Sequence, residues 1–139
     1  MYAIANEHEY KNVHSPLHST WMAVDYDRFS PYLESEARAF YQRLGVPAGS
    51  RLLDVACGSG QLALIAARDG IDVSGIDIAG NLITRANARA AAERLPACFQ
   101  VADAEELPFA DGSFDVVASF MGAMFAPRAY RVASELVRV

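Results

Sequence analysis

The strongest chemical signal in the chain lies in a short segment that reads Asp54-Val55-Ala56-Cys57-Gly58-Ser59-Gly60. Two glycines one residue apart let the backbone turn sharply and approach a ligand closely, and a helix after such a turn offers free N–H groups. Asp77 follows about 20 residues after Gly58, where a carboxylate can accept hydrogen bonds from both hydroxyls of a ribose. The glycine turn and this acid together predict a nucleoside-binding site.

The same segment leaves the kind of nucleoside open. Gly58, Gly60 and Ala63 satisfy the G-x-G-x-x-[GA] pattern of dinucleotide-binding domains, so an NAD-dependent oxidoreductase is one interpretation. Asp54 favours another, because a carboxylate just before the loop would repel a pyrophosphate and attract a cation. Asp103 ends a later strand and could accept the amine of an adenine. Three such carboxylates suit a ligand with an ammonium, a sulfonium, a ribose and an adenine but no phosphate.

Alternating strands and helices must position these acids. The apolar pattern predicts strands over 52–56, 71–76, 98–101 and 114–121, the last buried on both faces. It predicts helices over 61–68, 81–94 and 127–139, the last opened by Pro127. Such alternation is typical of an α/β fold, a Rossmann-like doubly wound parallel sheet, and right-handed crossovers give the strand order 3-2-1-4. Ligands of these sheets bind beyond the carboxyl ends of the strands, where the three aspartates lie.

The N-terminal part of the chain has a different character. Residues 1–19 are polar and are expected to form a loosely docked arm. Apolar residues over 20–44 recur at helical spacing and predict two helices broken at Ser30-Pro31. We therefore divide the chain into an arm with a helical cap, 1–45, and a Rossmann-like ligand-binding domain, 46–139.

Residues 51–139 resemble the class I S-adenosylmethionine-dependent methyltransferases, in particular the type 11 group similar to ubiquinone and menaquinone biosynthesis enzymes. Four blocks carry the resemblance in order: LLDVACGSGQLAL, VSGIDIAGNLITRA, FQVADAEELPFADGSFDVV and ASELVRV. The resemblance implies S-adenosyl-L-methionine as cofactor and in-line transfer of its methyl group to a small-molecule acceptor. It also implies that the chain lacks the C-terminal strands of the family's fold.

The resemblance assigns cofactor contacts to the glycine loop, to the acids after the first three strands with their neighbours, and to the end of the fourth strand. The implied cofactor-binding residues are Asp54, Ala56, Gly58, Gly60, Asp77, Ile78, Asp103, Ala104 and Phe120. Ala56 stands where the family more usually has glycine, and Tyr26 of the cap would approach the methionine end. No catalytic base and no metal ligand is identified.

Composition and charge exclude several classes of protein. A chain of 139 residues with 53% hydrophobic and 21% charged residues is expected to form one globular domain. A net charge of -5 argues against a nucleic-acid partner. No segment approaches the ~18 apolar residues that membrane insertion requires. Two cysteines make no disulfide framework, and the start MYAIANEHEY lacks the apolar core of a signal peptide, so a cytoplasmic location is expected.

Plainer interpretations stay open at several of these positions. Asp54 could be a structural carboxylate that accepts hydrogen bonds from loop amides. Cys57 is expected to be a small packing residue, because no base for a catalytic thiol is near it in the pattern. Glu105 and Glu106 are expected to form a solvated turn, and Trp21 is expected to fill the core.

Two alternatives to a methyltransferase also stay open: an NAD-dependent oxidoreductase, and a catalytically incomplete S-adenosylmethionine-binding or interaction module. If the sheet ends at its fourth strand, the apolar segment 114–121 becomes an edge, which proteins avoid leaving exposed. We therefore predict a homodimer through this edge.

Overall fold

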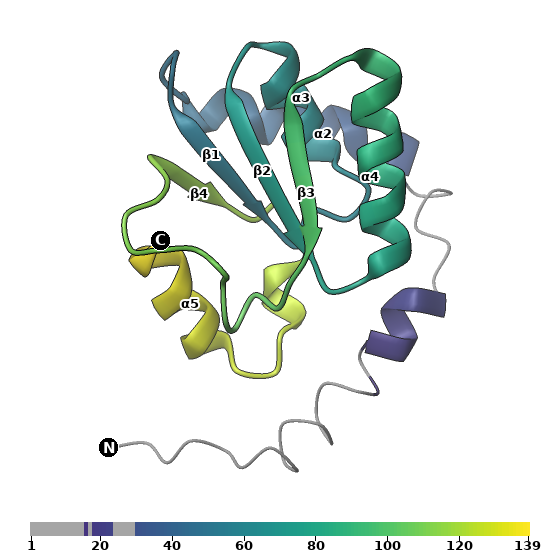
Figure 1. Cartoon of the computed structure of the whole chain (residues 1–139), viewed down its shortest axis with the longest axis vertical. Coiled ribbons are helices and arrows are strands. Elements are labelled where there is room, and N and C mark those ends of the chain that lie inside the picture. Colours follow the sequence, from purple (N-terminus) through teal and green to yellow (C-terminus); the bar gives the residue numbers. More distant parts are fainter. Residues whose placement is uncertain (1–15, 17, 24–29) are drawn as a thin grey trace.

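Four parallel strands form one sheet in the computed structural model, which describes residue 16 and residues 18–23 and 30–139 (Figure 1). The strands are β1 (Arg51–Val55), β2 (Asp72–Asp77), β3 (Ala97–Val101) and β4 (Val116–Ala118). They lie in the order β3-β2-β1-β4, and each neighbouring pair is parallel. The Rossmann-like α/β fold and its predicted strand order are confirmed.

Helices cover both faces of the sheet (Figure 1). The crossovers contain α3 (Gln61–Arg68) and α4 (Gly80–Glu93), and α5 (Ala129–Arg138) follows a 3-10 helix, η2 (Ala123–Phe125). Before β1 in the chain, α2 (Ser30–Leu44) packs against α3. Residues 18–23 are also helical. The start of α2 at Ser30 agrees with the predicted break at Ser30-Pro31.

The hydrophobic core is divided by the sheet into two clusters. Leu52 belongs to the cluster beneath α2, α3 and α4, whereas Leu53 and Val55 belong to the cluster beneath η2 and α5. Successive side chains of a strand point to opposite faces, so one short apolar segment supplies both clusters. All three side chains are fully buried. This burial holds β1 at the centre of the sheet and fixes the position of the loop that follows it.

β4 is much shorter than predicted. The apolar run over 114–121 predicted a strand of that length, but only Val116–Ala118 pairs with β1. Beyond Ala118 the chain leaves the sheet, because the N–H of Ala123 donates to Ser119 Oγ at 3.0 Å and the η2 turn follows. The apolar residues after Ala118 therefore line a cavity instead of extending the edge.

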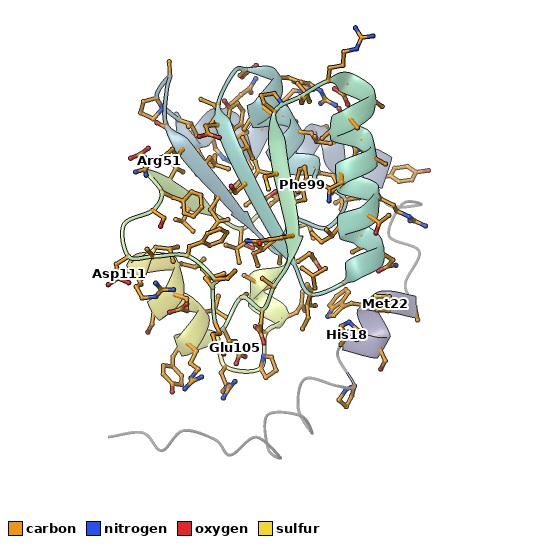
Figure 2. All side chains as sticks on the ribbon, viewed as in Figure 1. His18, Met22, Arg51, Phe99, Glu105 and Asp111 are labelled. Carbon is orange, nitrogen blue, oxygen red and sulfur yellow. The ribbon has the colours of Figure 1, made fainter. Side chains whose placement is uncertain are left out.

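The helix predicted to open at Pro127 begins instead at Ala129, and the reason is a buried carboxylate. Glu105 is 3% exposed. It accepts the backbone N–H of Arg128 at 2.7 Å and pairs with the guanidinium of the same residue. The prediction of a solvated turn at Glu105 is therefore wrong, whereas its neighbour Glu106 is exposed. Figure 2 labels Glu105 beside the start of α5.

Several predictions concern residues outside the described ranges. Most of the arm predicted over 1–19 and the position of Tyr26 lie there. The described residues of the arm, 16, 18 and 19, are helical. Within the described part of the chain, no helix is long and apolar enough to cross a membrane.

Candidate functional site

The glycine loop after β1 adopts a left-handed backbone at three positions. Ala56 has φ 58°, Gly58 has φ 56° and Gly60 has φ 87°. Gly58 tolerates this conformation without steric cost, but an alanine at Ala56 is strained by about 1–2 kcal/mol. The loop closes on itself through a 2.9 Å hydrogen bond from the N–H of Gly60 to the carbonyl oxygen of Cys57. The strand-turn-helix unit predicted from the sequence is therefore present.

Asp77, at the carboxyl end of β2, joins the glycine loop to the start of α4. Its Oδ2 accepts the N–H of Gly58 at 2.8 Å, and its Oδ1 accepts the N–H of Ala79 at 2.9 Å. The side chain is nearly buried, and this burial raises its pKa, opposed by the amide hydrogen bonds. A carboxylate has about four acceptor positions, so Asp77 keeps capacity for a ligand hydroxyl beside these amide hydrogen bonds.

Asp54 lies within β1, one step before the loop, and is 1% exposed. Its Oδ2 accepts the N–H of Ala63 in α3 at 3.1 Å. Burial raises its pKa to about 7, with a smaller contribution from the negative charge of Asp77, while the Ala63 hydrogen bond opposes the rise. The interpretation of Asp54 as a structural carboxylate thus has support in this contact. Asp54 also lines the cavity described below, so the two interpretations are compatible.

Asp103 follows β3 in a tight turn. Its Oδ1 accepts the N–H of Glu105 at 2.9 Å, and the residue forms an isolated antiparallel bridge with Glu106. The turn holds the carboxylate at the same edge of the sheet as Asp54 and Asp77. Three strands thus each supply one acid to this edge, as the sequence predicts.

A single cavity at the carboxyl edge of the sheet brings most of the predicted site residues together. Eight of the nine line it: Asp54, Ala56, Gly58, Asp77, Ile78, Asp103, Ala104 and Phe120. The ninth, Gly60, faces the core, since a Cβ on it would lie 3.2 Å from Phe99 and 3.3 Å from Leu64. Gly60 therefore has a conformational role, because its left-handed φ of 87° at the N-cap lets the backbone turn into α3.

Sequence reasoning missed several residues of the cavity, above all Gly122. A Cβ on Gly122 would stand 2.4 Å from the Cβ of Ala56, so the loop after β4 touches the glycine loop. An isolated glycine within an apolar run is a signal of close backbone approach, and the run FMGAMF contains one. Gln61, the first residue of α3, also lines the cavity and donates from Nε2 to Ser59 Oγ at 3.1 Å.

Helical residues 18–23 contribute Trp21 to the wall of the cavity. Trp21 lines it and packs on Phe125 of η2, with ring centroids 5.2 Å apart and a tilt of 52°. The amide of Asn81 donates to the carbonyl oxygen of Met22 at 3.3 Å, which ties the segment to α4. Figure 2 labels Met22 beside the lower end of α4. Trp21 therefore faces a ligand cavity, whereas the sequence favoured a core role.

Cys57 is a buried packing residue, as expected. It is 5% exposed, and burial raises the pKa of its thiol well above the ordinary value. A thiol that is neutral at physiological pH is a poor nucleophile. Among the described residues, no cluster of side chains could hold a metal ion.

The cavity has the donor and acceptor set that S-adenosylmethionine requires. Its described lining includes three carboxylates and no lysine, arginine or histidine. Carboxylates accept hydrogen bonds from an ammonium, from ribose hydroxyls and from an adenine amine, and their charge favours a cationic ligand. Apolar side chains such as Ile78 and Leu82 supply surfaces for a planar base. The residues present fit the cofactor that the sequence implies.

Fold and cavity together define a Rossmann-like domain with an acidic cavity at the carboxyl edge of its sheet. The methyltransferase domain family matches residues 53–139, which is more than half of the chain. The chain belongs to this family. Solved relatives include an S-adenosylmethionine-dependent methyltransferase of Methanosarcina mazei and an N-methyltransferase bound to S-adenosylhomocysteine, so S-adenosyl-L-methionine is the cofactor of the family. This membership decides against the NAD-dependent oxidoreductase.

Three relatives illustrate the similarity. An uncharacterized protein of Mycobacterium tuberculosis is 50% identical over 95 residues, covering 68% of this chain and 35% of the relative. A demethylmenaquinone methyltransferase of Beutenbergia cavernae is 37% identical over 102 residues, covering 73% and 41%. Phosphoethanolamine N-methyltransferase 2 of Haemonchus contortus, solved with phosphomonomethylethanolamine and S-adenosylhomocysteine, superposes with a TM-score of 0.70 at 30% identity, covering 75% and 25%. The chain thus spans well under half the length of these relatives.

Proposed function

We propose that this chain binds S-adenosyl-L-methionine in the cavity at the carboxyl edge of the sheet and directs its methyl group to a small-molecule acceptor. The observation that carries the proposal is the convergence of Asp54, Asp77 and Asp103 on one cavity whose described lining holds no cationic side chain. A cationic nucleoside ligand compensates these acids, whereas a dinucleotide would add the charge of its pyrophosphate to theirs.

The proposed roles follow from position. Asp77 would accept the ribose hydroxyls, with Ile78 against the adenine, and Asp103 with Ala104 would accept the adenine amine. At the other side, Ala56 and Gly58 would let the methionine part lie against the backbone, and Asp54 beneath them would favour its positive charge. Gly60 would act indirectly by setting the turn. Phe120 would face the reactive methyl group from the end of β4.

The proposed mechanism is in-line displacement at the methyl carbon. S-adenosyl-L-methionine supplies an activated methyl group on a sulfonium. The task of the chain is then to hold donor and acceptor in line and to exclude water, and positioning of this kind contributes several kcal/mol. The side chains of Trp21, Phe120 and Phe125 form the apolar wall that would exclude water.

Titration calorimetry tests the proposal directly. We expect S-adenosylmethionine and S-adenosylhomocysteine each to bind with a stoichiometry of one per chain, in the same cavity. We expect no binding of NADH. The single tryptophan, Trp21, lines the cavity and offers a second signal through its fluorescence. Absence of binding to either S-adenosyl ligand would refute the proposal. Binding without methyl transfer to any acceptor would favour the alternative of a catalytically incomplete binding module.

We also propose that two copies of the chain associate through β4. Among the described strands, β4 pairs only with β1, so no described strand pairs with its outer edge. Light scattering at micromolar concentration is expected to give the mass of a dimer. A monomer mass with the fold retained would contradict this.

The remaining proposals concern setting and organisation. Both described cysteines are free, Cys57 buried and Cys98 exposed, which suits a reducing cytoplasmic compartment. The negative net charge of -5 disfavours nucleic acid as partner. The division at residues 45 and 46 predicts that 46–139 retains S-adenosylhomocysteine binding more weakly, since Trp21 and Leu33 also line the cavity.

A further inference from the structure

Two backbone groups next to the glycine loop are each bound by a charged side chain. In a regular α-helix the N–H of residue i donates to the carbonyl oxygen of residue i−4, so an α3 longer by one residue would join the N–H of Ala63 to the oxygen of Ser59. The N–H of Ala63 donates to Asp54 Oδ2 at 3.1 Å. The oxygen of Ser59 accepts a hydrogen bond from Arg89 Nη1 at 2.8 Å. A carboxylate and a guanidinium thus bind the two groups that would otherwise extend α3 into the loop.

Arg89 reaches Ser59 from a fixed place on α4. Its neighbours Ala86 and Ala90 are buried, and both belong to the core cluster that α3 also enters. Arg89 itself is partly buried. A hydrogen bond with a charged donor is shorter and stronger than one between neutral groups. The core therefore holds a strong donor against the carbonyl oxygen of Ser59.

Ser59 links this donor to the wall of the cavity. The residue is 2% exposed, and a buried carbonyl that loses its donor is destabilising. Its side chain is bound as well, because Gln61 Nε2 donates to Ser59 Oγ at 3.1 Å. Gly58, which precedes Ser59, lines the cavity together with Gln61, and its N–H donates to Asp77 Oδ2 at 2.8 Å. A shift of Ser59 would therefore move two groups of the cavity wall.

We propose, resting on the proposed function, that Arg89 is a positioning residue for the cofactor: it holds the carbonyl of Ser59 outside α3 and so keeps the glycine loop in its binding shape. Arg89 does not line the cavity, so it acts through Ser59. Without the guanidinium, the oxygen of Ser59 competes with Asp54 for the N–H of Ala63. α3 then lengthens at the expense of the loop, and the amide of Gly58 leaves its place at the cavity wall.

Titration calorimetry of Arg89→Met tests this proposal. The variant keeps an unbranched side chain but has no donor, and it is expected to bind S-adenosylmethionine and S-adenosylhomocysteine at least tenfold more weakly than the parent. The sign of the change is informative. S-adenosylmethionine carries a net positive charge, so removal of a cation would by charge alone strengthen its binding. A loss of less than threefold for either ligand, or tighter binding, would overturn the proposal.

Two further variants separate positioning from general destabilisation. Arg89→Lys keeps a charged donor at the same place on α4 and is expected to bind both ligands within threefold of the parent. Arg43→Met is the matched control, because Arg43 is an exposed arginine in the last turn of α2 and lies outside the cavity lining. It is expected to bind like the parent. Urea denaturation establishes that each variant is folded under the conditions of the titration. If Arg89→Lys binds as weakly as Arg89→Met, the proposal is wrong.

The shape of the loop can be measured without a ligand. In NMR spectra of the free chain, the Cα and carbonyl carbon signals of Ser59 and Gly60 are expected to move toward helical values in Arg89→Met. In Arg43→Met they are expected to stay at the positions of the parent. Loop signals of Arg89→Met that keep the parent's values would contradict the proposal, because α3 would then begin at the same residue without the guanidinium.

The outcomes separate this proposal from the one on which it rests. If the parent binds S-adenosylhomocysteine and Arg89→Met binds it equally well, the positioning proposal is wrong and the cofactor proposal stands. If the folded parent binds neither S-adenosyl ligand, the cofactor proposal is wrong and the positioning proposal falls with it.

Discussion

Gly122 lies directly against Ala56, so that a Cβ built on Gly122 would stand 2.4 Å from the Cβ of Ala56 and 2.8 Å from its carbonyl oxygen. Ala56 follows β1, and Gly122 precedes η2 after β4. The two strands are neighbours in the sheet. The contact therefore closes the cavity between β1 and β4, where the connections leave the sheet in opposite directions. It is possible only because residue 122 is a glycine and has no Cβ.

Gly122→Ala is expected to destabilise the fold by about 1–3 kcal/mol, the usual cost of overpacking. Gly122 has φ -96° and ψ -42°, a conformation open to any residue, so the cost is steric alone. Urea denaturation measures it. Gly80→Ala is the matched control, because a Cβ there meets only Val101 at 3.6 Å. The double variant Gly122→Ala with Ala56→Gly should regain part of the lost free energy of unfolding. If it regains none, the cost does not come from contact with the methyl group of Ala56.

Ala56→Gly alone is expected to stabilise the protein by about 0.5–1 kcal/mol. The left-handed conformation costs an alanine about 1–2 kcal/mol, and the greater flexibility of unfolded glycine takes back part of the gain. The φ of 58° at Ala56 is the observation behind this expectation. Thermal denaturation is the measurement, and a lower melting temperature would show that the alanine methyl contributes more by packing than its backbone costs.

Asp54 is expected to make stability fall as pH rises. Its pKa is about 7 in the folded protein against 3.8 as the ordinary value, so the unfolded chain loses this proton first. Below pH 3.8 this pKa difference adds its full contribution, up to ~4 kcal/mol, to the free energy of unfolding. The contribution is lost as the pH rises from 3.8 to 7. Relative to Asp54→Asn, the parent should therefore lose stability between pH 4 and 7.

The measurement is the free energy of unfolding in urea at pH 5 and pH 8. Asp54→Asn keeps an oxygen for the Ala63 amide but cannot ionise. Asp72→Asn, at an exposed position, is the control and should track the parent at both values. A difference between parent and Asp54→Asn that does not change with pH would mean that Asp54 stays in one protonation state.

Glu105→Gln is expected to destabilise the protein by about 1–3 kcal/mol, because it leaves the guanidinium of Arg128 without its buried counter-charge. The side chain of Arg128 is 22% exposed, which lowers the cost below that of a fully buried pair. Glu106→Gln, at an exposed neighbouring position, should stay within ~0.5 kcal/mol of the parent. Hydrogen exchange should show faster opening at the start of α5 in Glu105→Gln only.

Asp103→Asn is expected to weaken S-adenosylhomocysteine about tenfold with little change in stability. The amide oxygen can still accept the N–H of Glu105, whereas the charge that strengthens a hydrogen bond to an amine is gone. Titration calorimetry gives the affinity. Glu106→Gln removes the same charge three residues away and should bind like the parent. Equal binding of all three proteins would exclude Asp103 from the adenine site.

Much of the fold was predictable because its signals are local. The apolar run of Leu52, Leu53 and Val55 followed by paired glycines predicts a buried strand and a tight turn, whatever the rest of the chain does. The strand order follows from the uniform handedness of crossovers. With both in place, the acids after the strands must meet at one edge, and Asp54, Asp77 and Asp103 do so.

Other features were decided only by contacts between distant segments. The apolar run after Ala118 is compatible with either a strand or a cavity wall. In the fold it forms the wall, because Gly122 packs against Ala56. The sequence around Glu105 indicates a surface acid, but in the fold it is buried against Arg128, which lies 23 residues away in the chain. Asp54 is a candidate ligand carboxylate in the sequence, and packing adds a second role, because the side chain is 1% exposed and accepts the N–H of Ala63 while it also lines the cavity. The sequence by itself thus determined the sheet and the residues at its edge, because periodicity and turn chemistry act over a few residues. Only the tertiary structure decided which of these residues line the cavity, since burial and charge compensation depend on partners that no local pattern specifies.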